Sequence, residues 1–333
     1  MQARGSEIVR CEHRLPAVAG RDAPLSILEV APTGGGAGKT PVLLLHGATF
    51  GSPMFDLAPP AMSMQHDLAA RGWRNFALDI RGYGRSMPSA TLDAPADRNE
   101  PYARLADAVD DLASGIRFVI EYTGCERANL VGFSWGSVVA CALAERNSRH
   151  LERLVLYAPL YAELNDLWIG MIADPANRAR INPALGAYRW IDLANLLSRW
   201  DADIPKGATI ADYRDPEVPH AILRCLAMAD PASGEREEAS FRAPTGALVD
   251  LFEIFNGRPL YDPRHISVPT LIIRGGDDTT STASDALRLF QLLGAKRKRF
   301  VTISPGSHFL CVERNAAELF SEIDLFLRTN APR

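Results

Sequence analysis

The chain has 333 residues, of which 47% are hydrophobic and 23% charged, enough for one large domain with an insertion or for two domains. Its 36 basic and 40 acidic residues leave a formal net charge of -4, so it lacks the single-sign field that nucleic-acid binding requires. The five cysteines are an odd number without close spacing, which predicts reduced thiols and neither a disulfide framework nor a zinc site. The N-terminus lacks the apolar core of a signal peptide, and no run approaches the roughly 20 apolar residues of a membrane span. We therefore expect a cytoplasmic protein with no membrane or nucleic-acid partner.

Short apolar runs alternate with longer amphipathic runs along most of the chain, which is typical of a parallel sheet covered by helices. In chain order, strands are predicted at residues 25–30, 42–46, 75–80, 128–133, 151–157, 270–274 and 300–303. Helices are predicted at residues 63–71, 102–122, 135–146, 284–293 and 316–328, and Gly72, Gly124 and Gly294 are read as C-terminal stops. The predicted fold class is α/β, with a mostly parallel central β-sheet flanked by helices.

The alternation fails between about residues 159 and 268, where tryptophans, prolines and charged residues mix. Helix-like pieces such as 191–200 and 247–255 occur there without strands. Because predicted sheet strands flank this region on both sides, we interpret it as an inserted, mainly helical cap over one edge of the sheet. The predicted domains are a core of residues 1–158 and 267–333 and a cap of residues 159–266.

Ser134 lies between two glycines, because residues 132–136 read Gly-Phe-Ser-Trp-Gly. The apolar run 128–131 precedes this pentapeptide, and the helix-like run 138–144 follows it. A nucleophilic serine on a strained strand-to-helix turn needs glycine two residues before and after it, because only glycine lets strand and helix approach closely. The pattern predicts a nucleophile elbow with Ser134 as the nucleophile.

A serine hydroxyl is a poor nucleophile at neutral pH and needs an adjacent base that a third group orients. His308 is the candidate base, because it follows the predicted strand 300–303 in a turn of small residues. For the third group, the predicted strand 270–274 leads into Asp277 and Asp278. Both aspartates are candidates, and the residues alone do not choose between them.

Five motifs in this order span nearly the whole chain: Leu44-Leu45-His46-Gly47, residues 79–86, residues 132–136, Gly275-Gly276-Asp277-Asp278, and Gly306-Ser307-His308-Phe309. Together they resemble the α/β-hydrolase superfamily with a helical cap, in which serine, acid and histidine follow in this order. The resemblance implies Ser134 as nucleophile and His308 as base and later acid. It favours Asp278 as the acid, because the family usually places it three residues after the glycine that ends the strand, with Asp277 as the alternative.

The resemblance also implies an oxyanion hole made of two backbone NH groups, those of Ala48 and Trp135. His46 is expected to brace this loop by hydrogen bonding. Asp79 resembles a catalytic carboxylate at a strand end, but with Arg81 and Arg85 nearby we expect a salt-bridged loop brace.

The cap contributes large apolar residues, most of which we expect in its own small core. They are Trp168, Met171, Trp190, Trp200, Phe241, Phe252, Phe255 and Tyr261. The remainder would wall an apolar pocket above Ser134 and favour a substrate with a hydrophobic part. Four arginines are candidates for a carboxylate contact or, more simply, solvated surface: Arg189, Arg224, Arg242 and Arg258.

The function implied by the resemblance is a serine hydrolase that cleaves a carboxylic ester or related acyl bond of a partly hydrophobic small molecule. Acyl transfer to an acceptor other than water, or hydrolysis of a carbon-carbon bond in a diketone, uses the same triad and stays open. The alternative outside the enzymes is a ligand-binding or receptor protein that retains the serine without significant turnover. No metal-ligand spacing such as His-Glu-x-x-His occurs, so we expect neither a metal nor another cofactor.

Overall fold

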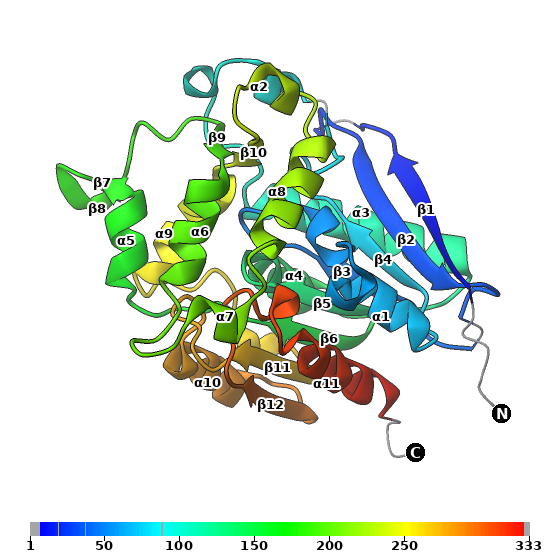
Figure 1. Cartoon of the computed structure of the whole chain (residues 1–333). Helices are drawn as coiled ribbons and strands as arrows, with labels where there is room; N and C mark the ends of the chain where they lie inside the picture. The colour runs from blue at the N-terminus through cyan, green and yellow to red at the C-terminus, as the bar shows by residue number, and fades with distance from the viewer. Residues whose placement is uncertain (1–6, 19, 37, 88, 330–333) are drawn as a thin grey trace.

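The computed structural model describes residues 7–18, 20–36, 38–87 and 89–329. Its main sheet has eight strands: β1 (Ile8–Leu15), β2 (Leu25–Pro32), β3 (Val42–Leu45), β4 (Asn75–Leu78), β5 (Ala128–Phe133), β6 (Leu151–Tyr157), β11 (Thr270–Gly275) and β12 (Lys298–Ile303). Their order across the sheet is β1-β2-β4-β3-β5-β6-β11-β12 (Figure 1). Neighbours from β4 to β12 are parallel, whereas β2 runs antiparallel to both β1 and β4. The predicted mostly parallel sheet is confirmed.

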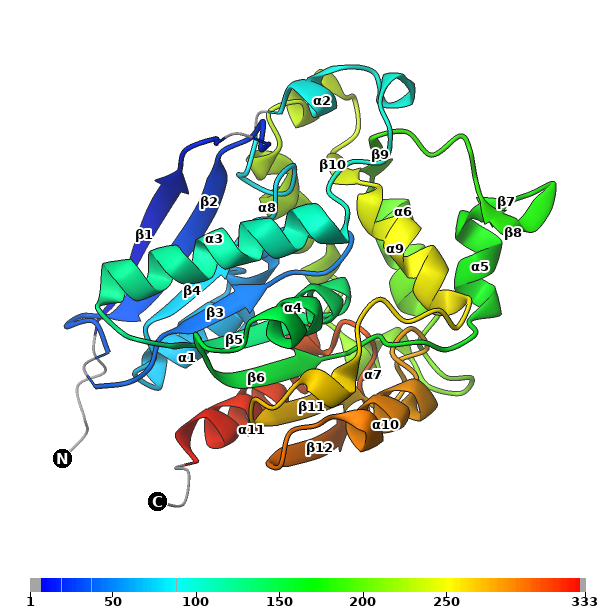
Figure 2. The same cartoon turned by 180° about the vertical axis from the view of Figure 1, so that it is seen from behind.

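Helices cover both faces of this sheet. They are α1 (Met64–Ala70), α3 (Leu105–Thr123), α4 (Trp135–Arg146), α10 (Ala283–Leu292) and α11 (Ala316–Arg328). The short helix α2 (Ala90–Asp93) lies apart from these layers, and its Leu92 packs in a small cluster with Met87 and Ala187. Side chains alternate across a strand, so Leu43 and Leu45 belong to the apolar cluster beneath α3, α4 and α10, while Val42 and Leu44 belong to the cluster beneath α1 and α11. Figures 1 and 2 show these two helix layers on opposite sides of the sheet. Burial on both faces explains why β3 has only apolar residues.

Strand β1 was not predicted from the sequence. It lies at the edge of the sheet, and its residues 9–12 are exposed. An edge strand needs no continuous apolar run. The sequence Arg-Cys-Glu-His-Arg in β1 is mostly polar, so it lacks the alternation of apolar and polar residues that predicts a strand. It pairs along its whole length with β2, from Ile8 opposite Pro32 to Leu15 opposite Leu25.

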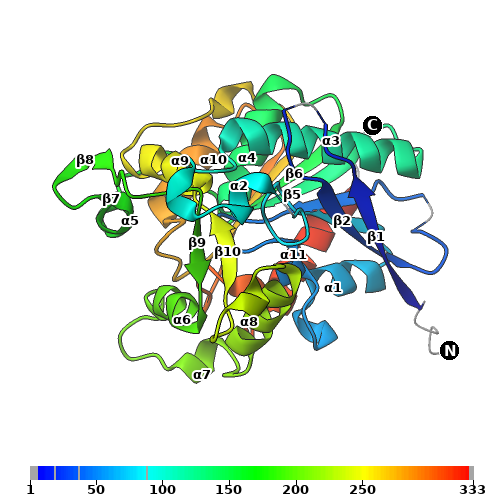
Figure 3. The ribbon, with the colours of Figure 1, turned by 90° about the horizontal axis from the view of Figure 1, so that it is seen from above.

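The segment between β6 and β11 holds five helices and four short strands. They are α5 (Asp166–Ile172), α6 (Leu193–Asp201), α7 (Ile210–Tyr213), α8 (Val218–Ala229), α9 (Gly246–Phe255), β7 (Ala173–Asp174), β8 (Asn177–Ile181), β9 (Tyr188–Ile191) and β10 (Phe241–Pro244). Figures 1 and 3 show α5, α6 and α9 on the side of the molecule opposite β1. The strands pair as β7 with β8 and β9 with β10, two ladders that the sequence analysis did not anticipate. The division into a core and a cap at residues 159–266 stays a prediction.

No helix in the described part of the chain is both long enough and apolar enough to span a bilayer.

Candidate active site

The residues singled out from the sequence follow neighbouring strands of the sheet. Ser134 directly follows β5, Ala48 follows β3, Asp278 follows β11 and His308 follows β12. These strands are parallel, so their carboxyl ends share one edge, where sites of open α/β sheets form. The topology therefore brings together residues that are up to 260 positions apart in the sequence.

Ser134 occupies a strained turn between β5 and α4. Its φ is 54° and its ψ is -122°, a backbone conformation that residues other than glycine rarely adopt. A Cβ on Gly132 would lie 2.6 Å from the Gly136 carbonyl oxygen, and one on Gly136 would lie 2.3 Å from that of His46. Both glycines are thus required for the close approach of strand and helix, as expected of a nucleophile elbow.

Ser134, His308 and Asp278 form one chain of hydrogen bonds. The Asp278 carboxylate lies 2.8 Å from His308 Nδ1, and His308 Nε2 lies 2.9 Å from the Ser134 hydroxyl oxygen. Because a carboxylate accepts the Nδ1 proton, Nε2 is left to accept the serine proton. This arrangement can activate a serine, and the catalytic role of the three residues stays a prediction.

The two neighbouring aspartates point in different directions. One Asp278 oxygen faces His308, and the other accepts the backbone NH groups of Thr280 and Ser281, each at 2.8 Å. Burial acts to raise the pKa of Asp278, but the adjacent imidazole and these hydrogen bonds outweigh it and lower that pKa. Asp277 instead accepts the Tyr213 hydroxyl at 2.7 Å. The structure thus places Asp278, and not Asp277, next to His308, and the role of Asp278 as the acid stays a prediction.

The expected oxyanion donors lie beside Ser134. Trp135 is the first residue of α4, so its NH is one of the four that no helical carbonyl accepts. Ala48 and Ser134 line the same cavity. The Trp135 side chain is fully buried and its ring NH donates to Asp250 at 3.2 Å. The oxyanion role of the two backbone NH groups stays a prediction.

His46 lies in the loop after β3, where the oxyanion site is expected, and makes no hydrogen bond to Ser134. Its Nδ1 lies 2.8 Å from the Gly47 carbonyl oxygen, and its Nε2 accepts the Ile80 NH at 3.1 Å. Burial lowers the pKa of His46 to about 4, so the ring is neutral at pH 7 and ties the loop after β3 to the end of β4.

Asp79 braces a loop as expected, but not through salt bridges. Its carboxylate accepts the backbone NH of Ser52 at 2.5 Å and that of Arg85 at 3.0 Å. The two arginine side chains pair elsewhere, Arg81 with Asp111 and Arg85 with Glu12. Backbone NH groups satisfy the carboxylate because the tight turn 82–85 folds back over it.

Asp203, a residue that the sequence analysis missed, links the segment between β6 and β11 to the site. Its carboxylate accepts the backbone NH of His308 at 3.0 Å and that of Thr279 at 3.2 Å, and it pairs with Arg199 at 3.1 Å. Asp203 is buried, so one carboxylate holds the histidine loop and the acid loop together. A lone aspartate after a predicted helix gives no signal of such a contact.

A cavity of about 460 Å³ opens above Ser134 and His308. Of the large residues noted in the sequence, Trp168, Met171 and Trp190 line it. The remainder are buried in the two apolar clusters: Trp200, Phe241, Phe252, Phe255 and Tyr261. The walls are mainly apolar, and no acidic side chain is among the lining residues.

Of the four arginines noted in the sequence, Arg189 lines this cavity. Arg242 is buried and pairs with Asp230 at 2.7 Å, and the exposed Arg258 pairs with Glu253 at 2.5 Å. Arg224 is exposed on α8. Three of the four thus lie away from the cavity.

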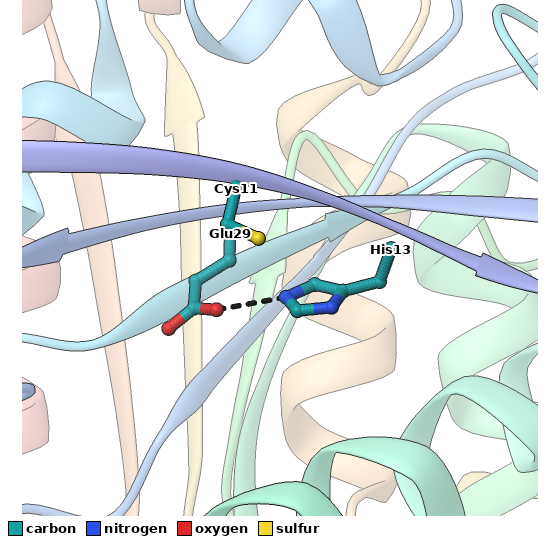
Figure 4. Close-up of side chains that lie close together, drawn as sticks. All are labelled: Cys11, His13 and Glu29. Carbon is teal, nitrogen blue, oxygen red and sulfur yellow. Dashed lines mark hydrogen bonds and ion pairs between the residues drawn. The ribbon is translucent and has the colours of Figure 1, made fainter.

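A second group of reactive side chains lies on the two N-terminal strands. The ligand atoms of Cys11, His13 and Glu29 lie within 4.8 Å of one another (Figure 4). However, Glu29 is already bound on both oxygens, at 2.8 Å from His13 Nε2 and at 2.6 Å from Arg74 Nε. The guanidinium places a positive charge where a cation would bind, so this cluster has the character of an ion-pair network.

A parallel sheet with a serine on a strand-to-helix turn, followed by an acid and a histidine at the ends of later strands, defines the class of α/β-hydrolases. The chain belongs to the alpha/beta hydrolase family, whose sequence model matches residues 42–322.

Individual relatives agree with this membership. The chain is 27% identical over 277 residues to the AB hydrolase superfamily protein YisY of Bacillus subtilis, covering 80% of this chain and 84% of that protein. It is 29% identical over 222 residues to a probable proline iminopeptidase of Streptomyces coelicolor, and this match covers 63% of this chain and 57% of that protein. Among solved structures, a thermophilic esterase from Thermogutta terrifontis matches with a TM-score of 0.64 and 19% identity over 96% of this chain and 98% of that one. The family and the two sequence relatives support a hydrolase, and the solved structure supports the fold.

Proposed function

We propose that this protein hydrolyses a carboxylic ester or related acyl bond of a partly hydrophobic small molecule through an acyl-enzyme on Ser134. The observation that carries the proposal is the hydrogen-bonded chain from Ser134 through His308 to Asp278, with distances of 2.9 and 2.8 Å. Such a chain activates a hydroxyl that is otherwise inert at neutral pH.

In the first step, Ser134 attacks the acyl carbonyl and His308 Nε2 takes the serine proton. Asp278 holds the imidazole in the required tautomer and stabilises its charged form. The NH groups of Ala48 and Trp135 stabilise the oxyanion, and each such donor contributes about 3 kcal/mol to lowering the barrier. His308 then protonates the leaving group.

In the second step, His308 takes a proton from water, which attacks the acyl-enzyme and releases the acid. The hydroxyl oxygen of a serine at the elbow can carry the acyl group in the covalent intermediate, which supports cleavage of an acyl bond. The apolar lining formed by Trp168, Met171, Leu248 and Leu251 supports a hydrophobic acyl or alcohol part.

Cleavage of a residue from a free peptide N-terminus is less well supported, although one relative is a probable proline iminopeptidase. A protonated substrate amine needs a negative partner. Among the residues that line the cavity, none is acidic.

The proposal predicts that a fluorophosphonate probe labels the wild-type protein and that Ser134→Ala abolishes labelling. Ser198→Ala is the matched control, because Ser198 lines the same cavity and has no histidine partner among the described hydrogen bonds. It should label at the wild-type rate. Labelling that survives in folded Ser134→Ala protein would contradict the proposal.

A further inference from the structure

Arg189 places a positive charge at the cavity above Ser134, and its guanidinium has no acidic partner among the described residues. It lies on β9 opposite Ala243 of β10 and lines the cavity together with Ser134 and His308. Its side chain makes one hydrogen bond to a described residue, from Nη2 to the Thr49 hydroxyl at 2.9 Å. A guanidinium has five NH donors, so most of the donors of Arg189 are free for a ligand.

The surroundings of Arg189 differ from those of the other arginine at this cavity. Arg199 pairs with Asp203 at 3.1 Å, whereas no carboxylate lies within ion-pair distance of Arg189 among the described residues. Burial lowers the pKa of Arg189, and the neighbouring Tyr83 only partly offsets this. Arg189 is half-buried, so a ligand in the cavity can reach its guanidinium. A partly desolvated guanidinium without an anion is less well stabilised than one that pairs with a carboxylate, which favours an anionic ligand at this position.

We propose that Arg189 binds a carboxylate of the substrate, so that the molecule cleaved carries a free carboxylate in addition to its acyl bond. This inference rests on the proposed function, and it narrows the substrate class to anionic, partly hydrophobic esters. The planar guanidinium matches the two oxygens of a carboxylate in a bidentate pair. The otherwise apolar walls strengthen this pair and accept the hydrophobic part of the molecule.

A purely structural role for Arg189 makes a different prediction. Thr49 follows Ala48 in the expected oxyanion loop, so the bond from Arg189 to Thr49 braces that loop. If bracing were the whole role, loss of Arg189 would slow neutral and anionic esters alike. The two roles are therefore separated by pairs of substrates that differ by one carboxylate group.

The test uses two pairs of esters, each with a neutral and a charged member. In the first pair, 4-nitrophenyl hemiglutarate carries a carboxylate on the acyl side and 4-nitrophenyl butyrate does not. In the second pair, 4-butyryloxybenzoate carries a carboxylate on the leaving group and phenyl butyrate does not. We expect wild type to prefer the charged member of one pair, and that pair identifies the side of the substrate that Arg189 binds. Arg189→Gln should lower kcat/KM for that ester about 10- to 100-fold, mainly through KM, and change its neutral counterpart less than about threefold. Arg189→Lys should recover part of the loss.

Two controls accompany this comparison. Thr49→Val removes the loop bond and should change both members of each pair equally. Arg224→Gln removes an exposed arginine away from the cavity and should change neither.

Binding of the product is measured separately by calorimetry on Ser134→Ala protein, with glutarate and 4-hydroxybenzoate as ligands and with Arg189→Gln added in a second variant. We expect weaker binding of the preferred anion when Arg189 is replaced. Equal effects on neutral and charged esters, with unchanged anion binding, would overturn the inference while leaving the hydrolase proposal intact. Loss of serine-dependent turnover on every ester would instead overturn the proposed function.

Discussion

Ser134 adopts a backbone conformation with a φ of 54° that costs about 1–3 kcal/mol for a residue with a side chain. The surrounding contacts hold it there: the Ser134 NH donates to the Tyr157 carbonyl at 2.9 Å, and its own carbonyl accepts the Ser137 hydroxyl at 2.6 Å. These bonds fix the hydroxyl where His308 Nε2 can reach it. Strain at this residue is thus coupled to the position of the candidate nucleophile.

The two adjacent aspartates give a matched pair of variants. Asp278→Asn replaces the acceptor of the His308 Nδ1 proton by a group that favours the wrong tautomer, so we expect kcat to fall by about three to four orders of magnitude. Asp277→Asn weakens contacts to the Tyr213 hydroxyl and the Gly306 NH and should leave kcat within about tenfold of wild type. Steady-state kinetics on one ester measures both. A larger loss in Asp277→Asn would reverse the assignment.

Among the individual residues of the candidate site, those that lie in a local motif could be predicted from the sequence. Ser134 and His308 stand in turns whose glycines are visible in the chain, and the structure brings the two together. Asp203 and Arg189 have no local motif, because their significance comes from packing between segments more than 70 residues apart. Such contacts follow from the tertiary structure alone.

The elbow depends on a strand and a helix that touch at glycines. Gly136→Ala would place a methyl group against the His46 carbonyl, so the strand and the helix must separate. We expect the free energy of unfolding to fall by about 1–3 kcal/mol and kcat to fall with it. Chemical denaturation measures the stability change.

Gly170→Ala is the control for this substitution. Gly170 lies within α5, and a Cβ there meets nothing within 4 Å. We expect a gain in stability of about 0.5–1 kcal/mol, because alanine favours a helix over glycine. Destabilisation of both variants by the same amount would contradict the role assigned to Gly136.

Strands and helices of the buried core were predicted from the sequence to within a few residues, because apolar periodicity dominates there. Gly124 ends α3 with a φ of 70°, as expected of a helix stop. Gly294 serves a different purpose: a Cβ there would lie 2.2 Å from the Arg264 carbonyl, so glycine permits close packing. Tertiary contacts of this kind, like the edge position of β1, are not encoded in local periodicity.

For the whole molecule, the site joins two parts of the chain. The strand ends supply Ser134, Asp278 and His308, while the segment between β6 and β11 supplies Arg189 and Asp203. The motifs predicted the first set, and the absence of strand alternation predicted that an insertion would sit near them. The detailed shape of the cavity depends on side-chain packing that no single stretch of sequence determines.

The buried Asp79 makes the stability of the whole molecule depend on pH. Burial raises the pKa of Asp79 from 3.8 to about 6, so the folded protein holds a proton there between pH 4 and 6 that the unfolded chain has released. Stability from this group is therefore present at low pH and lost as the pH rises through 6. We expect the stability of wild type relative to Asp79→Asn to fall by roughly 2–3 kcal/mol between pH 4 and pH 7.

Denaturation of both proteins across this pH range measures the difference. Asp110→Asn, on an exposed position of α3, controls for the loss of one negative charge. A stability difference between wild type and Asp79→Asn that stays constant or grows with pH would be inconsistent with the raised pKa.

The formation of an acyl-enzyme on Ser134 is tested most directly by mass spectrometry after rapid mixing with an ester and acid quenching. Trypsin releases Ser134 in the peptide of residues 128–146, which also contains Ser137, so fragmentation distinguishes the two hydroxyls. We expect the mass of the acyl group on Ser134, and its absence from Ser134→Ala. An acyl adduct on Ser137 or elsewhere, or turnover of the ester with no adduct in wild type and equal rates in Ser134→Ala, would contradict the account.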